Sequence, residues 1–561
     1  MDALTGSLAA PKAHAPMDTP ALVTRHTAIV GAGLAIVVAM QIALLFQKGI
    51  NWDEFFHLTE IYRFRDGTLT HPLQTFWVRL LAWVPATGGT SVDQIIVVRV
   101  FMLLAALVTA GGVFAVARRF AEPAAALLCA LAFLSAGYVF TQAFAYRADP
   151  LAAACLVWVL WIAGSQRLGW AKVAAGAALV ALAGLFTIKS AFWVVPIGGY
   201  ALYALWPMSR GEQVARIVRL AVLAGGGAVL FGLAIALHGA GLPGDTAHAS
   251  GKALNSAGTT VFSEGLFPQG RFLLRQIVMG LPFAVLAVLA IRDWRHRDGS
   301  ARTLVLLAGL YGMLLTLVFY RNAYPYFFVF LLPPVAIALA PLLAKAAARG
   351  AAPLYALVFV ANGAILFALD PADPLPNQQI VQEGVREVFP QPVTYIDFSG
   401  QISDYPRAVE FMTSGWGLAK YRERGVPEIS ELAQRDPIPL LIDNHGVISA
   451  ALAGQPGPER LLPQDERFIR ENYVRHWGPM FVAGKRIAPG VSTIEILVPG
   501  TYTLEGQGVT MAGRVLADGD TIELQRGTVK VDAPSWATLR WGDHLPRPTI
   551  APPRGMMMSE Y

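Results

Sequence analysis

The chain has 561 residues, of which 55% are hydrophobic and 15% are charged, and it has two cysteines. Soluble proteins have about 45–50% apolar and about 25% charged residues, so this composition, with a mean hydropathy of +0.49, indicates an integral membrane protein. It excludes a cytosolic enzyme, a disordered chain and a secreted disulfide scaffold. The formal net charge of +6 is expected to reflect basic residues that orient the chain in a bilayer. We expect no nucleic-acid partner.

The first part of the chain is rich in apolar stretches. A bilayer core about 30 Å thick needs roughly 20 apolar residues per helix. Stretches of this kind lie at approximately residues 27–46, 95–117, 121–141, 150–165, 171–187, 190–206, 220–238, 275–291, 303–320, 325–344 and 351–369. We therefore predict a polytopic α-helical membrane domain over residues 27–369, with about eleven spans, after a cytoplasmic tail at 1–26.

The short loops give the orientation, because Lys and Arg are retained on the cytoplasmic side. With the N-terminus inside, the inner loops hold basic clusters, namely Arg118 and Arg119, Arg167 and Lys172, Arg210, Arg216 and Arg219, Arg292, Arg295, Arg297 and Arg302, and Lys345 with Arg349. An odd number of spans then places the C-terminal region outside. We predict a multi-pass inner-membrane protein with a periplasmic C-terminal region.

Three outer segments are long enough to fold. Residues 47–94 contain apolar residues at helical spacing, such as Phe55, Leu58 and Ile61, which predicts a helix on the membrane surface, and a second one over 75–84. Residues 239–274 are rich in Gly and Ser and are expected to form a mobile loop. Residues 370–561 have an ordinary soluble composition.

The C-terminal region is expected to divide. Strand-like runs such as VTYIDF and IPLLIDN, separated by helical patterns, predict an α/β region over 370–489. Alternating apolar and polar residues with Pro-Gly and Asp-Gly turns predict a small β-sandwich over 490–545. The remaining residues, 546–561, are predicted to be disordered.

Ionisable side chains at membrane depth are costly and are functional candidates for that reason. In the predicted topology several lie at the outer ends of spans, namely Asp53, Glu54, Arg147, Asp149, Lys189 and Arg321. A carboxylate can act as a general base toward a hydroxyl, and Arg and Lys can hold a phosphate and stabilise its charge. The set fits a lipid-phosphate-linked sugar whose chain lies in the bilayer.

Several candidate residues also have a simpler interpretation. Asp53 and Asp149 lie where carboxylates cap helices, and Arg147 can extend to the interface as an anchor. His57 lies one turn after Asp53 and is either a hydrogen-bonded interfacial histidine, a substrate contact, or part of a metal pair. Tyr324 and Tyr326 fit an interfacial aromatic belt as well as a sugar contact.

The order of motifs WDE, HPL, RADPL, IKSAFWVVP and YRNAYPYFFVFLLPP resembles membrane glycosyltransferases of the C-type (GT-C) fold. The similarity is to the protein-mannosyltransferase-like branch, which includes lipid A aminoarabinose transferases, and it covers residues 27 to about 345. Two motifs depart from the usual pattern of the branch. His71 stands before Pro72-Leu73 where a proline is usual, and Lys189 precedes Ser190-Ala191 where Gly-Pro is usual. These departures leave the substrate open.

The resemblance implies roles for the candidate residues. Asp53 would be the catalytic base, and Glu54 and Asp149 would position the acceptor or sugar or help to bind a metal. Lys189, Arg147 and Arg321 would hold the donor phosphate. Tyr324 and Tyr326 would contact the sugar or the lipid head group.

The sequence therefore predicts an inverting glycosyltransferase that uses a polyprenyl-phosphate-sugar donor on the periplasmic side. Its acceptor would be lipid A, a polysaccharide, a protein or another lipid. A divalent cation at Asp53 and Asp149 is compatible with the oxygen ligands, although the basic residues could neutralise a phosphate without one. The alternative is a transporter or flippase of a lipid-linked sugar, which would be expected to show inverted repeats and broken helices near mid-membrane.

Overall fold

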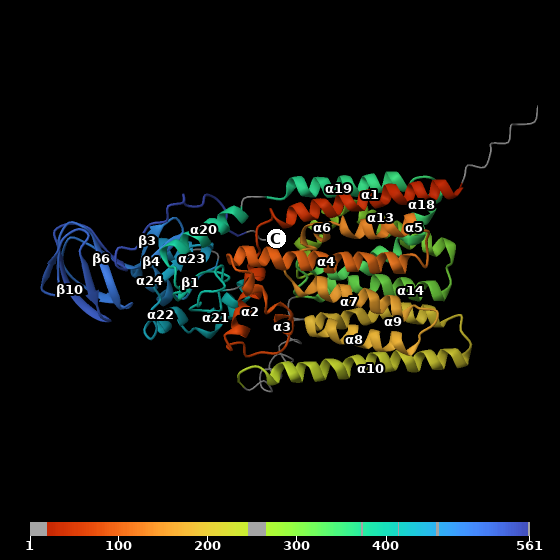
Figure 1. The fold of residues 1–561 in the computed structure, drawn as a ribbon, viewed down its shortest axis with the longest axis horizontal. Helices are drawn as coiled ribbons and strands as arrows, with labels where there is room; N and C mark the ends of the chain where they lie inside the picture. Colours follow the sequence, from red (N-terminus) through yellow and green to blue (C-terminus); the bar gives the residue numbers. More distant parts are fainter. Residues whose placement is uncertain (1–18, 245–264, 372–373, 413, 456–458, 559–561) are drawn as a thin grey trace, which may run out of the picture.

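A computed structural model describes residues 19–244, 265–371, 374–412, 414–455 and 459–558. A long helical bundle is joined at one end to a C-terminal part that contains the strands (Figure 1). Part of the predicted tail at 1–26 and most of the loop predicted at 239–274 lie outside the described residues.

The bundle is built from apolar helices of different lengths. They are α1 (Thr19–Leu45), α4 (Ser91–Ala117), α5 (Pro123–Leu134), α7 (Ala148–Ala163), α8 (Trp170–Phe186), α9 (Val194–Leu205), α10 (Arg210–Ala240), α12 (Gly270–Met279), α13 (Leu281–Arg297), α14 (Ala301–Gly312), α17 (Pro333–Ala338), α18 (Ala340–Ala348) and α19 (Ala352–Leu369). Many outward side chains of these helices are large and apolar, such as Leu237 and Val288, which suits contact with lipid.

The predicted membrane spans agree with these helices. Within the described residues, six helices are long and apolar enough to cross a membrane, and α12 with α13, bent by 92°, would be a seventh span. Four shorter apolar helices lie at 123–134, 148–163, 170–186 and 333–348. Each of the predicted spans coincides with one of these segments, so the prediction of a polytopic helical membrane protein is confirmed.

Short elements occupy the end of the bundle next to the C-terminal part. They are α2 (Trp52–Arg65), α3 (Trp77–Leu81), η1 (Val84–Thr87), α6 (Tyr138–Gln142), η2 (Ile188–Trp193), η3 (Met313–Leu315), α15 (Thr316–Phe319) and α16 (Phe327–Leu331). The helix predicted for the membrane surface is α2, which begins at a capping box formed by Asn51 and Glu54. Its residues Phe55, Leu58 and Ile61 are fully buried, and α2 lies between the bundle and the C-terminal part (Figure 1).

The C-terminal part combines helices with two sheets. The helices are α20 (Pro374–Val388), α21 (Gly415–Arg424), α22 (Glu428–Ala433), α23 (Gly446–Ala453) and α24 (Pro463–Asn472). The strands are β1 (Tyr395–Ile396), β2 (Leu440–Ile442), β3 (Tyr473–Trp477), β4 (Met480–Ile487), β5 (Gly490–Ile496), β6 (Gly500–Gly506), β7 (Val509–Met511), β8 (Arg514–Leu516), β9 (Thr521–Leu524), β10 (Gly527–Ala533) and β11 (Ala537–Trp541).

One sheet runs through both halves of this region. Its order is β1-β2-β4-β11-β6-β9, with β3 also paired to β4, and the second sheet has the order β5-β10-β7-β8. Strand β4 pairs with β2 through Leu440↔Val482 and with β11 through Ala537↔Ile487. An apolar core that includes Ile487, Leu504 and Val531 lies between the two sheets as in a β-sandwich. The α/β and sandwich regions predicted from the sequence therefore share strand β4.

The segment predicted to be disordered, 546–561, is described as far as residue 558. Side chains of α20 and β3 donate hydrogen bonds to its backbone carbonyl groups. Trp477 Nε1 donates to Ile550 O at 3.2 Å, and Asn377 Nδ2 donates to Arg554 O at 2.9 Å. Gln378 Nε2 donates to Met557 O at 2.8 Å. Buried donors thus hold a segment whose own sequence has no strand or helix pattern.

A close helix crossing in the bundle predicts a stability difference between two adjacent glycines. A Cβ at Gly199 of α9 would lie 2.6 Å from Gly309 Cα of α14, whereas a Cβ at Gly198 would meet no atom of the described residues within 4 Å. Gly199→Ala should therefore lower the free energy of unfolding by about 1–3 kcal/mol through overpacking. Gly198→Ala should be neutral or stabilising by up to about 1 kcal/mol. Thermal unfolding of the two purified variants measures the difference, and equal melting temperatures would contradict the close crossing.

Candidate active site

An aspartate in the first turn of α2 meets an arginine that precedes α7. Asp53 lies one residue into α2, where the capping box aligns the backbone N–H groups, and its carboxylate forms an ion pair with Arg147. The side chains of Asp53 and Arg147 are 13% and 12% exposed. Both charges are largely removed from solvent, so each depends on the other for compensation.

A second ion pair lies beside the first. Lys189 Nζ in η2 is 2.6 Å from Asp149 Oδ1 in the first turn of α7. The ring of Tyr326 lies beneath both cations, with Arg147 Cζ 3.5 Å and Lys189 Nζ 5.4 Å from its centroid. The two pairs therefore form one cluster on a shared aromatic floor, in which cation–π contact adds to the ion pairing.

Burial and charge determine the protonation of the carboxylate in α2. Burial raises the pKa of Asp53, while Arg147 and Lys189 act in the opposite direction and Glu54 adds to the increase. The net direction is upward, so this carboxyl group binds a proton more readily than an exposed aspartate does. A raised pKa is what a general base near neutral pH requires.

Glu54 points away from this cluster and meets an arginine inside α4. Its Oε1 and Oε2 accept hydrogen bonds from Arg99 Nη2 at 2.6 Å and Arg99 Nε at 2.8 Å. The backbone N–H groups of Asn51 and Tyr146 donate to the same carboxylate at 3.1 and 2.9 Å. Burial raises the pKa of Glu54, but Arg99 and these hydrogen bonds outweigh it and the net pKa is lowered. Glu54 thus stays ionised.

Arg99 also bonds the backbone of the turn before α2. Besides Glu54, its guanidinium donates to Lys48 O at 2.8 Å and Gly49 O at 3.0 Å, in the turn that leads into α2. The sequence prediction did not name this residue. The sequence feature that could have identified it is that Arg99 is the single arginine within the predicted span 95–117. A charge at that depth needs a buried partner.

His57 lies one turn after Asp53 and is packed by aromatic rings. The ring centroids of Trp77 and Tyr146 are 5.0 and 5.7 Å from that of His57, and its Nδ1 is buried with no hydrogen-bond partner among the described residues. Burial lowers the pKa of His57 well below its usual value, and the nearby charges of Arg147 and Lys189 lower it further. The imidazole is therefore neutral.

Tyr324 lies beside the cluster, whereas Arg321 contacts the C-terminal part. The ring centroids of Tyr324 and Tyr326 are 6.0 Å apart. The Arg321 guanidinium faces the ring of Trp416 in α21, with Cζ 5.9 Å from its centroid. The structure thus brings Asp53, Arg147, Lys189, Asp149 and Tyr326 together, with Arg321 turned toward the C-terminal part.

An apolar cavity of about 720 Å³ opens within the bundle next to η2. Its lining comes from α7, α8, α9, α10 and η2 and includes Ile188, Ser190 and Ala191, the residues on either side of Lys189. The cavity extends along α9 to Leu205, near the far end of that helix. An apolar volume of this kind suits a hydrocarbon chain.

The donor set does not favour a divalent cation. Asp53 and Asp149 each hold a basic side chain, and within the described residues no group of three or more His, Cys, Asp or Glu side chains gathers as metal ligands would. A hard cation needs several oxygen ligands. The charges at this site are instead balanced by Arg147 and Lys189.

Comparisons with known proteins give the fold a name. No protein-family model and no curated protein matches the sequence. Among solved structures, ArnT from Cupriavidus metallidurans bound to undecaprenyl phosphate is similar with a TM-score of 0.54 and 14% identity, over 77% of this chain and 95% of ArnT. The oligosaccharyltransferase of Archaeoglobus fulgidus in the apo form has a TM-score of 0.51 and 11% identity, over 94% of this chain and 98% of that one.

A third match is AglB from Archaeoglobus fulgidus in complex with an inhibitory peptide and a dolichol-phosphate, with a TM-score of 0.51 and 11% identity, over 94% and 97% of the two chains. At these identities the likeness is one of fold. The predicted GT-C fold is thereby confirmed: a polytopic helical domain followed by a strand-rich C-terminal region.

The pairing of Glu54 and Arg99 predicts an asymmetric mutational effect. Glu54→Gln leaves the buried guanidinium without its carboxylate and should lower the free energy of unfolding by about 3–5 kcal/mol. Adding Arg99→Met removes the unpaired charge, so the double variant should be more stable than Glu54→Gln alone. Denaturant unfolding measures both, and equal stabilities would contradict the pairing.

The same measurement has a defined pH dependence. The pKa of Glu54 is lower in the folded state, so its contribution is fully present above the unfolded value of about 4.3. The stability difference between wild type and Glu54→Gln should shrink as the pH falls through the lowered folded-state pKa.

Proposed function

We propose that this protein is an inverting glycosyltransferase that moves a sugar from a polyprenyl-phosphate-linked donor to an acceptor hydroxyl at the outer face of a bacterial inner membrane. The observation that carries the proposal is the cluster of Asp53, Arg147, Lys189 and Asp149 on the ring of Tyr326. An apolar cavity is lined by Ile188, Ser190 and Ala191, the chain neighbours of Lys189. A carboxylate base, two phosphate-binding cations and a lipid-sized volume are the parts that this reaction needs.

The reaction step assigns a role to each group. The Asp53 carboxylate removes the proton from the acceptor hydroxyl, and the acceptor oxygen attacks the anomeric carbon from the face opposite the phosphate. The bond between that carbon and the phosphate oxygen breaks, and its electron pair leaves on the polyprenyl phosphate. Arg147 and Lys189 stabilise the charge that develops on the phosphate.

Donor binding and base activation are linked in this arrangement. Within the cluster Arg147 pairs with Asp53, and Lys189 pairs with Asp149. A donor phosphate competes for the same guanidinium and ammonium groups. When Arg147 turns to the phosphate, Asp53 loses the charge that lowers its pKa and becomes a stronger base.

The other predicted residues take supporting roles in the proposal. Asp149 orients Lys189, and Glu54 fixes the first turn of α2 through Arg99. Arg321 and Tyr324 lie where an incoming head group would pass, and His57 offers a neutral imidazole next to the acceptor hydroxyl. Tyr326 holds the two cations at one level.

The fold comparisons support the donor class. The similar ArnT structure is bound to undecaprenyl phosphate, and the similar AglB structure is in complex with a dolichol-phosphate and a peptide. Two structures with this fold therefore bind a lipid phosphate. The acceptor for this chain, whether lipid A, polysaccharide, protein or lipid, is open in the proposal.

The lipid donor predicts what copurifies with the protein. Wild-type protein extracted from membranes should carry a polyprenyl phosphate, with or without a sugar, detectable by native mass spectrometry. Lys189→Ala should deplete it about tenfold or more, because a charge-assisted phosphate contact is worth roughly 1.5–3 kcal/mol. The control is Lys172→Ala, the same change at the opposite end of α8, which should leave the lipid bound. Bulk phospholipid alone in every sample would count against the donor class.

The base assignment predicts a separation of binding from transfer. Asp53→Asn should lower sugar transfer by about 10²–10⁴-fold, the usual contribution of a general base. It should also bind the lipid phosphate at least as tightly as wild type, because Arg147 no longer pairs with a carboxylate. Asp66→Asn, at the exposed end of the same helix, is the matched control and should keep transfer. If Asp53→Asn left sugar transfer unchanged but altered the distribution of the lipid across the bilayer, the result would favour a flippase.

A further inference from the structure

The C-terminal part contacts α2 along its whole length, on the side away from the site. Successive helical residues are rotated by roughly 100°, so Phe55 and Thr59 lie on the face opposite Asp53 and His57. One face of α2 therefore carries the candidate base, and the other meets the C-terminal part. Any displacement of the second face moves the first.

The contacts begin just before the helix. Gln378 of α20 accepts a hydrogen bond from Ile50 N at 2.9 Å and donates to Ile50 O at 2.8 Å. Ile50 immediately precedes the helix cap Asn51, and both Ile50 and Gln378 are fully buried. The amide side chain thus saturates both backbone groups at the entry to α2.

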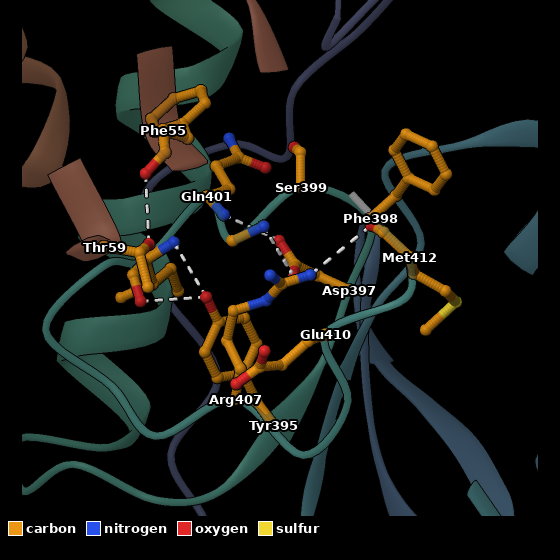
Figure 2. A network of polar contacts seen from close by, with 12 residues as sticks. Phe55, Thr59, Tyr395, Asp397, Phe398, Ser399, Gln401, Arg407, Glu410 and Met412 are labelled. Carbon is orange, nitrogen blue, oxygen red and sulfur yellow. Dashed lines mark hydrogen bonds and ion pairs between the residues drawn. The ribbon is translucent and has the colours of Figure 1, made fainter. Parts of the chain in front are cut away.

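A loop over residues 397–403 contacts the middle of the helix. Ser403 Oγ donates to Phe55 O at 3.4 Å. A Cβ on Gly400 would lie 3.1 Å from Thr59 Oγ1 and 3.0 Å from Arg407 Cδ. At the end of α2, Arg63 forms an ion pair with Glu410. Figure 2 shows Asp397, Ser399 and Gln401 of this loop beside Phe55 and Thr59.

This loop is itself held rigidly. Its Asp397 is fully buried, with Oδ1 accepting from Gly400 N at 3.0 Å and Oδ2 accepting from Gln401 N at 2.7 Å. Asn444 Nδ2 donates to the same carboxylate at 3.2 Å, and Arg407 Nε lies 3.4 Å from it (Figure 2). A buried carboxylate that is satisfied on both oxygens fixes a single loop conformation.

The same loop also binds the helix that carries Arg99. Ser403 N donates to Ser91 Oγ at 2.9 Å, at the start of α4. Gln382 links the two elements, since its Nε2 donates to Gln401 O at 2.5 Å and its Oε1 accepts from Val92 N at 3.3 Å. The loop thus holds α2 and α4 in register, and these helices carry the Glu54–Arg99 pair.

We propose that the loop 397–403, together with Gln378, is a positioning element of the active site, and that Gly400 is a positioning residue for Asp53. This inference rests on the proposed transfer reaction. The donor cations Arg147 and Lys189 belong to α7 and η2, whereas the loop's contacts described above are to α2 and α4. A disturbed loop should therefore misplace the base while the donor site stays intact.

Gly400→Ala tests the contact, with Gly425→Ala as the matched control. Both glycines have left-handed backbones, with φ of +77° and +66°, but a Cβ at Gly425 meets no atom of the described chain within 4 Å. Gly400→Ala should lower kcat at least about tenfold without raising the KM for the donor, since small misplacements of a reacting group cost up to about 10²-fold. Gly425→Ala carries similar backbone strain and should keep the wild-type kcat.

Rescue separates positioning from general damage. Thr59→Ala removes the Oγ1, the atom of α2 that the new methyl group meets, so Gly400→Ala combined with Thr59→Ala should regain part of the lost kcat. Gly400→Ala combined with Thr59→Ser keeps the oxygen and should not. If Gly400→Ala fails to fold, Gln378→Glu, which removes the donor to Ile50 O, should give the same loss of kcat without a higher donor KM. Equal kcat in Gly400→Ala and Gly425→Ala would overturn the proposal.

Amide hydrogen exchange of residues 52–65 gives a readout without catalysis. Exchange in α2 should be faster in Gly400→Ala than in Gly425→Ala. If the wild-type protein transfers no sugar, the proposed function fails, while this comparison still decides whether the loop holds α2. Equal exchange in the two variants would show that it does not.

Discussion

The need to pair buried charges governs the outer end of this bundle. Ionised groups removed from water are stable only with an opposite charge or several hydrogen bonds. Asp53, Glu54 and Asp149 are all nearly buried, and each has a cationic partner on a different element. These pairs connect α2 to α4 and α7, and α7 to η2, so the same interactions that hold the site together join the helices.

The pairs differ in what they leave available for chemistry. Glu54 is saturated by Arg99 and two backbone donors, which gives a lowered pKa and a fixed helix start. Asp53 has a raised pKa and shares Arg147 with the aromatic ring of Tyr326. Two adjacent carboxylates thus acquire opposite properties, because one faces a fully satisfied arginine and the other faces the cluster.

The C-terminal part extends this constraint beyond the membrane domain. A buried carboxylate, Asp397, fixes a loop that contacts both α2 and α4. Helix α2 therefore contacts both this loop and the bundle. This helix, whose apolar residues predicted a location on the membrane surface, thus takes part in the intramolecular contact between the bundle and the C-terminal part.

The sequence by itself determined the membrane class, the predicted spans and their order, because apolar length and basic loops are local properties. It also indicated that Asp53, Arg147, Asp149 and Lys189 could converge, since each lies at the outer end of a predicted span. Only the tertiary structure decided the pairing: Asp53 with Arg147, Lys189 with Asp149, and Glu54 with Arg99, a residue whose role depends on a contact 45 positions away. Likewise, residues 546–558 carry no local pattern and are ordered by buried donors on α20 and β3. Which charges pair, and where residues 546–558 bind, depends on which side chains are buried together. Tertiary packing decides this, and periodicity along the chain does not specify it.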